Sequence, residues 1–237
     1  MRHFINGSKV LGIAFLLQFI TSFVNGVIIR PAVIVPGNIE ATLQQIAANP
    51  TLLQIYILLD LITALGIIFL GAMLFITVRK ENEKAALVGL GFYILEAALL
   101  AVSRTSAVSL LTSSQAYAAA GDPATWLAMG QVTLEFVSFA GSMAMLAFCL
   151  GAILFYYLLY RSRVVPAWLS LWGLIAVFPV LVATLMVSFG YEFPMLLALP
   201  YVPFEFAIGV WILIKGVPEE TGGTREAVQV KPQVVGT

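Results

Sequence analysis

The sequence predicts an all-α, polytopic membrane protein: a six-helix transmembrane bundle with the N-terminus and the C-terminus both cytoplasmic. Of its 237 residues, 61% are hydrophobic and only 10% are charged, and the mean hydropathy is +1.00. A soluble domain carries about 25% charged residues, so this chain has too few to cover a globular surface. Its apolar residues occur in runs of roughly 20, the length that crosses about 30 Å of hydrocarbon.

The predicted spans cover residues 10–29, 52–78, 85–111, 132–160, 168–189 and 195–214. The first follows a short basic stretch, as a secretory signal does, but its apolar core is too long and no small-x-small cleavage pattern precedes Arg30. We interpret it as an uncleaved helix. The spans make up one transmembrane domain, residues 1–216. Residues 217–237 carry Pro, Gly and charges without apolar periodicity, which predicts a disordered cytoplasmic tail.

Basic residues predict the orientation of the chain, because they concentrate in cytoplasmic loops. Ten of the twelve lie at the N-terminus, in two alternate loops or in the tail: Arg2, Lys9, Arg79, Lys80, Lys84, Arg161, Arg163, Lys215, Arg225 and Lys231. Only Arg30 and Arg104 lie at or near the opposite side. Aromatic residues around Arg161, including Tyr156, are interpreted as a belt at the inner interface, and Tyr201 as a further interfacial aromatic.

Two outer connections carry helix signals. The segment "GNIEATLQQIAANP" places Ile39, Leu43 and Ile46 on one helical face, which favours a short surface helix over a plain loop. In "GDPATW", Asp122 is a candidate N-cap and Pro123 a candidate first helical residue. The fourth helix is therefore expected to begin well outside the hydrocarbon.

An internal echo links three of the spans. "LGAMLF" at residues 70–75 recurs as "LGAILF" at 150–155, with a weaker form, "IGVWIL", at 208–213. One interpretation is a helical hairpin repeated three times, and the other is chance among the few residue types that a span uses. If the repeat is real, Gly71, Gly151 and Gly209 mark close contacts between helices.

Ionisable side chains within the predicted spans give the main functional signal. The acids are Asp60, Glu96, Glu135 and Glu205, and one cation, Arg104, accompanies them. Four ionised acids facing lipid would cost roughly 10 kcal/mol, so we expect them to converge on a shared polar interior.

Depth along the helices sorts these residues into two groups. An outer group would contain Asp60, Arg104 and Glu135. An inner group would contain Glu96, Glu205 and Gln18. One arginine cannot neutralise every acid, so at least one inner carboxyl is expected to hold a proton, because burial disfavours the charged form.

The sixth span contains the unusual segment "LPYVPFEFAIG". Pro200 and Pro203 each remove a backbone donor and are expected to break the helix just before Glu205. Broken helices near the midplane are typical of transporter binding sites. The alternative is an ordinary proline kink, with Glu205 hydrogen-bonded to a neighbouring helix.

Several catalytic classes lack their residues. The single histidine, His3, lies in the polar N-terminus. The predicted spans therefore contain no histidine for a zincin motif or for a serine–histidine protease site. Asp60 is the only aspartate in the predicted spans, so an aspartyl dyad is absent too. The single cysteine, Cys149, cannot form an internal disulfide. No catalytic residue, metal site or cofactor is expected, and the net charge of zero gives no sign of a nucleic-acid partner.

Three stretches of the chain are similar to a known family: "GIAFLLQFI", "YILEAALLAVS" and "LGAILFYYLLYRSRVVPAWLSLWGLIAV". In the last, a helix ends in aromatics, crosses a basic turn with Pro166 and re-enters. With these features the whole chain resembles the bacterial six-span proteins catalogued as domain of unknown function 4386. The resemblance implies the fold and a multi-pass location in a bacterial inner membrane. It implies no activity and no catalytic residues.

Three functions remain open. The chain is a small-solute or proton-linked transporter in which Glu96 and Glu205 titrate, or a non-catalytic membrane subunit or sensor with structural carboxylates, or, less favoured, an intramembrane lipid-modifying enzyme. The expected partners are the lipid bilayer, a small solute or proton, and either a second copy or another membrane subunit.

Overall fold

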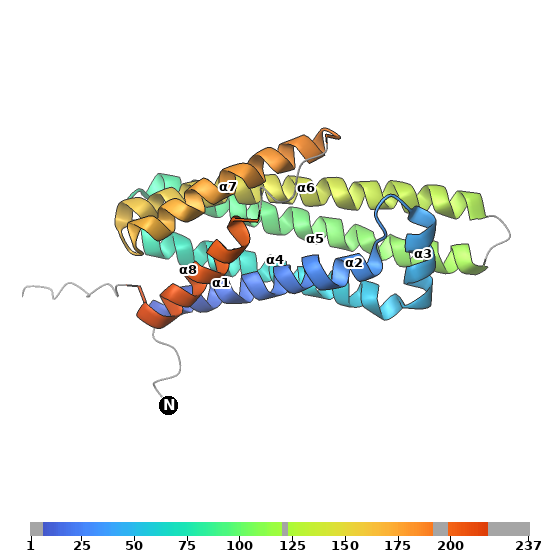
Figure 1. The fold of residues 1–237 in the computed structure, drawn as a ribbon, viewed down its shortest axis with the longest axis horizontal. Helices are drawn as coiled ribbons and strands as arrows, with labels where there is room; N and C mark the ends of the chain where they lie inside the picture. The colour runs from blue at the N-terminus through green and yellow to red at the C-terminus, as the bar shows by residue number, and fades with distance from the viewer. Residues whose placement is uncertain (1–6, 120–122, 192–198, 218–237) are drawn as a thin grey trace, which may run out of the picture.

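The computed structural model describes residues 7–119, 123–191 and 199–217. Within these ranges the secondary structure is helical, without strands. Most helices lie side by side along the long axis of the molecule, and one short helix is set across an end (Figure 1). The elements are α1 (Gly7–Phe23), the π-helix η1 (Val24–Ile29), α2 (Arg30–Val33), α3 (Ile39–Ala48), α4 (Pro50–Val78), α5 (Glu83–Ala119), α6 (Pro123–Ser162), α7 (Ala167–Ser188) and α8 (Tyr201–Lys215).

Five helical stretches are long and apolar enough to cross a membrane: Lys9–Val33, Pro50–Val78, Glu83–Ala119, Ala124–Ser162 and Ala167–Ser188. The chain is therefore a multi-pass helical membrane protein. The sixth predicted span, 195–214, begins outside the described residues. What is described of it, α8, has 15 residues and measures about 22 Å, less than the hydrocarbon thickness.

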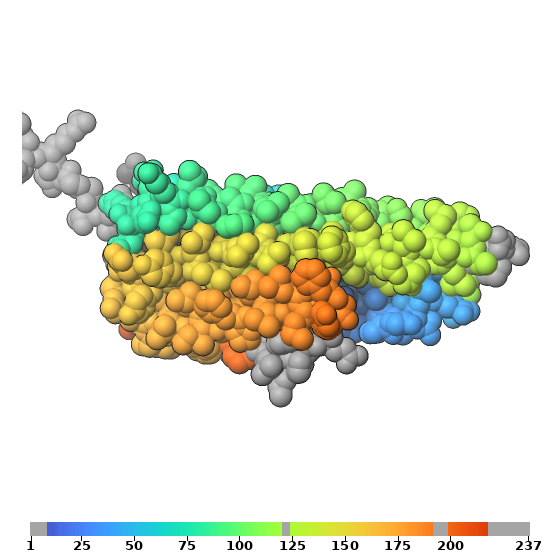
Figure 2. Space-filling view, turned by 90° about the horizontal axis from the view of Figure 1, so that it is seen from above, coloured from blue at the N-terminus to red at the C-terminus, as the bar shows by residue number. Residues whose placement is uncertain are grey.

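Two helices are longer than a membrane is thick. α5 has 37 residues and α6 has 40, which corresponds to about 55 Å and 60 Å. They pack along their whole length, whereas α7 covers only the half that contains the basic turns (Figures 1 and 2). The other half of the α5–α6 hairpin thus extends beyond the hydrocarbon. As predicted, α6 begins at Pro123, while Asp122 lies outside the described residues.

The expected surface helix is present as α3, which lies across the outer end of the bundle (Figure 1). Asn38 begins it: its Oδ1 accepts a hydrogen bond from the backbone N–H of Ala41 at 2.9 Å, as an N-cap does. Leu43 and Ile46 are fully buried beneath it. The side chain of Gln45 donates to the backbone oxygen of Ala32, which fixes α3 to the end of the first span.

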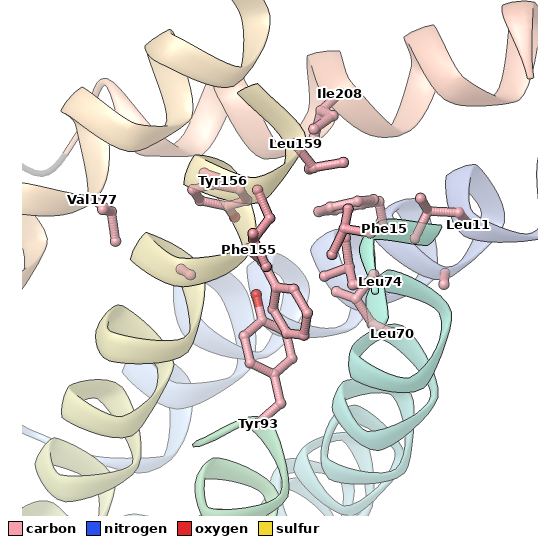
Figure 3. Close-up of a cluster of buried hydrophobic side chains, with 14 of the residues drawn as sticks. Leu11, Phe15, Leu70, Leu74, Tyr93, Phe155, Tyr156, Leu159, Val177 and Ile208 are labelled. Atoms are coloured by element: carbon pink, nitrogen blue, oxygen red, sulfur yellow. The ribbon is translucent and has the colours of Figure 1, made fainter. Parts of the chain in front are cut away.

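The core at the inner half is built around an aromatic ring between two glycines. Tyr93 of α5 lies against Gly71 of α4 and Gly151 of α6. Its ring makes an edge contact with Phe155, with centroids 5.2 Å apart, as Figure 3 shows. The two glycines of the sequence echo therefore occupy equivalent places on opposite sides of one side chain.

The third glycine of the echo, Gly209, marks another close helix contact. A Cβ at Gly209 would lie 2.9 Å from Leu16 of α1, and one at Gly12 would lie 2.5 Å from the backbone nitrogen of Leu213. The small residues let α1 and α8 approach closely, as is usual in membrane bundles. α8 is thereby held to the first span of the chain.

Candidate functional site

An ion pair links α4 and α5 toward the outer end of the bundle. Nε of Arg104 donates to Oδ2 of Asp60, and both side chains are about nine-tenths buried. The guanidinium also lies over the Tyr56 ring, 4.5 Å from its centroid. Arg104 Nη1 donates to Ser103 Oγ at 3.2 Å, and Ser103 donates to the backbone oxygen of Val137 at 2.8 Å. Asp60 and Arg104 thus meet as the sequence predicted, and hydrogen bonds connect them to α6.

Glu135 does not join this pair, and that expectation was wrong. Its side chain is exposed and accepts a 2.6 Å hydrogen bond from Nε2 of Gln131, on the same face of α6. The reason is direction and not depth. Ser103, the neighbour of Arg104, donates to the backbone oxygen of Val137, so Glu135 lies within one turn of the level of the pair. Its side chain points away from the pair, to the exposed face of α6.

Asn25 is a buried polar residue that the sequence analysis missed. It lies in η1 and is only 2% exposed. Its Nδ2 donates to the backbone oxygen of Tyr56 at 3.1 Å, and its Oδ1 has no hydrogen-bond partner. π-Helical turns are frequent at functional sites. The sequence did contain a signal for this buried residue, because Asn25 is a polar amide within the apolar first span.

Glu96 and Glu205 come together in the inner half of the bundle. Glu96 on α5 is 9% exposed, and its Oε2 is buried without a hydrogen-bond partner. The charged side chain with which it interacts electrostatically is Glu205 of α8. Within the described ranges, neither carboxyl forms an ion pair with a lysine or arginine.

Gln18 lies at the same level as these acids. It is 8% exposed, and its Oε1 lies against Gly66 without a hydrogen-bond partner. α4 and α5 run antiparallel, and the Asp60–Arg104 and Gly71–Tyr93 contacts fix which residues lie opposite each other. Along the helix axis, Glu96 therefore lies within one turn of the level of Gly66. The α1–α8 contacts likewise put Glu205 within one turn of Gln18.

Three tyrosines surround the two acids. Tyr156 Oη and Tyr201 Oη lie 2.6 Å apart in a buried hydrogen bond. Tyr93, Tyr156 and Tyr201 each interact electrostatically with Glu205. The interfacial interpretation of Tyr156 and Tyr201 was wrong, because Tyr156 is 1% exposed and Tyr201 8%. Position in the chain could not show which side of the helix they occupy. We call Gln18, Tyr93, Glu96, Tyr156, Tyr201 and Glu205 the inner cluster.

The two prolines before Glu205 lie at the beginning of α8. Pro200 precedes the first residue of the helix and Pro203 lies in its first turn, where backbone N–H groups have no helical partner in any case. The chain turns at Leu199–Pro200, and the backbone oxygen of Pro200 accepts a hydrogen bond from Trp172 Nε1 at 3.2 Å. α8 thus begins four residues before Glu205, and the prolines begin a helix rather than kink one.

Among the described residues, no group of three or more His, Cys, Asp or Glu side chains comes together to hold a metal ion. Glu96 and Glu205 are instead two carboxyls on different helices that interact electrostatically with each other and with nearby tyrosines. By its long apolar helices, the chain falls in the class of multi-pass helical membrane proteins.

Comparison with protein families identifies the group within this class. Residues 10–216 match the family described as domain of unknown function DUF4386, and the chain belongs to it. No curated protein and no solved structure gave a significant match.

Proposed function

We propose that the protein is a proton-linked transporter of a small solute, with Glu96 and Glu205 as its titrating groups. The observation that supports this most is Glu96: a buried carboxyl with one oxygen unpartnered and another carboxyl as its charged neighbour. A carboxyl in this setting binds and releases protons more readily than it forms a stable ion pair, and intramembrane acids commonly serve proton relays.

The topology that fits this function has six spans, with both termini in the cytoplasm of a bacterial inner membrane. The basic turn between α4 and α5, the basic turn between α6 and α7, and the end of α8 lie at one end of the molecule (Figure 1). Basic residues favour the cytoplasmic side. The interruption at Leu199–Pro200 then divides the last crossing and leaves Glu205 at the beginning of a half-helix, as in many transporter sites.

The test is solute-driven proton movement in vesicles. The full-length protein would be reconstituted into liposomes that contain a pH-sensitive dye, and sugars, amino acids, organic acids and organic amines would be added class by class. We expect one class to change the internal pH. Glu96→Gln and Glu205→Gln should each abolish that change, whereas Glu135→Gln, which alters an exposed acid outside the inner cluster, should retain it. Absence of any response, or full activity in both inner variants, would refute the transporter.

A non-catalytic membrane subunit is the second candidate. The hydrogen bond between Tyr156 and Tyr201 and the tight fit of Tyr93 between two glycines favour it, because both join helices without requiring a ligand. This function predicts that Glu96→Gln and Glu205→Gln change the unfolding temperature while no solute class moves protons.

A further inference from the structure

We infer that the inner cluster binds a positively charged organic solute, an amine or a quaternary ammonium ion, in exchange for protons on Glu96 and Glu205. This inference rests on the proposed function and names its substrate class. Three independent features of the cluster support it: charge, unpartnered atoms and aromatic lining.

The charge of the cluster is unbalanced. Glu96 on α5 and Glu205 on α8 interact electrostatically, and within the described residues neither has a cationic partner. Two carboxylates cannot both stay ionised in a medium of low dielectric constant without a compensating charge. Protons supply that compensation in the empty state. One monovalent organic cation can replace one of these protons, which leaves to water. The cation then balances one carboxylate, the other carboxyl keeps its proton, and the site stays neutral.

The unpartnered atoms of the cluster are all oxygens. Within the described chain, the buried side-chain atoms without a hydrogen-bond partner are Gln18 Oε1, Asn25 Oδ1, Tyr93 Oη, Glu96 Oε2 and Ser170 Oγ. Three of the five belong to the inner cluster. An amide or carboxylate oxygen only accepts hydrogen bonds. Gln18 Oε1 and Glu96 Oε2 therefore have no donor in the empty protein, and an ammonium group or the polarised methyl groups of a quaternary amine would supply positive charge where these two oxygens lie.

The aromatic lining selects an organic cation over a metal ion. The rings of Tyr93 and Phe148 lie 6.3 Å apart, and those of Phe148 and Tyr201 lie 5.4 Å apart in an edge contact, so the three rings pack in series beside the acids. Aromatic faces attract organic cations and are the usual recognition surface for quaternary ammonium groups. Among the described residues, no third acidic, histidine or cysteine side chain joins the two carboxyls to form a metal-binding group.

Glu205 gives the cluster its contact with the outside. Its side chain is only partly buried, unlike that of Glu96, so the cluster reaches the molecular surface in the first turn of α8. The titratable groups that face the two acids are Tyr93 on α5, Cys149 and Tyr156 on α6, and Tyr201 on α8. All four are neutral near pH 7 and leave the two carboxyls as the groups that exchange protons.

The experiment titrates the full-length protein, purified in detergent and weakly buffered, with tetramethylammonium chloride. Calorimetry measures binding, and a pH indicator measures proton release. We expect saturable binding with release of about one proton, so that Kd rises about tenfold for each unit by which the pH is lowered. tert-Butanol, an uncharged molecule of similar shape, should not bind. Glu96→Gln should abolish both signals, and Glu135→Gln should leave them unchanged.

A second variant guards against loss of folding. Tyr93→Phe keeps the ring and removes only an unpartnered hydroxyl, so it should fold and bind tetramethylammonium several-fold more weakly.

No binding by the parent protein, equal binding of tert-butanol, binding without proton release, or unchanged binding by Glu96→Gln would each overturn the inference. If another solute class drives proton movement in vesicles, the transporter stands and the ammonium class is wrong. If tetramethylammonium binds with proton release but no class is transported, the site stands and the transporter is wrong.

Discussion

The ring of Tyr93 lies so close to Gly151 that a Cβ on the glycine would come within 2.6 Å of Cδ2 of the ring. On the opposite side, a Cβ at Gly71 would lie 3.0 Å from Cβ of Tyr93. The side chain thus occupies a slot that only glycine leaves open on α6. Because Tyr93 also faces the two acids, this slot fixes the aromatic wall of the inner cluster.

Gly151→Ala should therefore destabilise the protein. The methyl group would displace a buried ring, and overpacking of this kind costs about 1–3 kcal/mol. The measurement is thermal unfolding in detergent. Gly141→Ala is the matched control on the same helix, since a Cβ there meets nothing within 4 Å. That change should be neutral or stabilise by up to about 1 kcal/mol, because alanine favours helices. If the two substitutions changed the unfolding temperature equally, the claim that Gly151 makes room for the Tyr93 ring would be wrong.

The buried pair of Asp60 and Arg104 should be much more sensitive to loss of one partner than of both. Asp60→Asn leaves the Arg104 guanidinium buried without its counter-charge, which costs about 3–5 kcal/mol. Replacing both, as Asp60→Leu with Arg104→Met, should recover most of that loss, because no isolated charge remains. Chemical unfolding of the single and double variants gives the comparison.

An exposed ion pair supplies the reference for this prediction. Arg161 Nε and Glu81 Oε1 lie 3.0 Å apart at the end of the bundle that carries the basic turns, and the Arg161 side chain is more than half exposed. Glu81→Gln should change stability by less than about 1 kcal/mol. A larger loss from Glu81→Gln than from Asp60→Asn would contradict the assignment of the buried pair.

Composition and apolar run length predicted the helical membrane fold, and the periodicity of Ile39, Leu43 and Ile46 predicted the surface helix α3. The sequence echo predicted close contacts at Gly71, Gly151 and Gly209 on the condition that the repeat is real. These patterns were not sufficient for helix ends. α5 and α6 continue past the predicted spans because their more polar end segments still consist of residues that allow a helix, which hydropathy does not register. The number of crossings also remains a prediction, since the described part of the last one is only α8.

The site was predictable in depth but not in direction. Counting residues from the basic turns put Asp60 beside Arg104, and Glu96 near Glu205 and Gln18. The same counting grouped Glu135 with Asp60, although the helix turns its side chain outward. It also could not distinguish Tyr156, which is buried, from Tyr157, which is 45% exposed. Side-chain direction depends on which neighbours each helix packs against, and a single sequence does not contain that information.

The proposed orientation predicts which engineered cysteines react from each side of the membrane. The native Cys149 is fully buried and should stay unlabelled. Glu135→Cys lies on the exposed face of α6, in the half away from the basic turns, so a membrane-impermeant maleimide should label it in intact cells. Arg79→Cys should be labelled only after the membrane is permeabilised. Reversed labelling would refute the cytoplasmic termini.

Removal of single hydroxyl groups separates the structural from the ligand-binding role of the tyrosines. Tyr156→Phe breaks the 2.6 Å bond to Tyr201 and leaves the Tyr201 hydroxyl buried without a partner, which should cost about 1–3 kcal/mol. Tyr93→Phe removes a buried hydroxyl that lies near the hydroxyl of Tyr156 without forming a hydrogen bond of standard geometry, so the unfolding free energy should change by less than it does in Tyr156→Phe. Unfolding in mixed detergent measures both. If Tyr93→Phe were as destabilising as Tyr156→Phe, the Tyr93 hydroxyl would have a partner in the empty protein. It would then be part of the helix packing, and the argument that it waits for a ligand would be wrong.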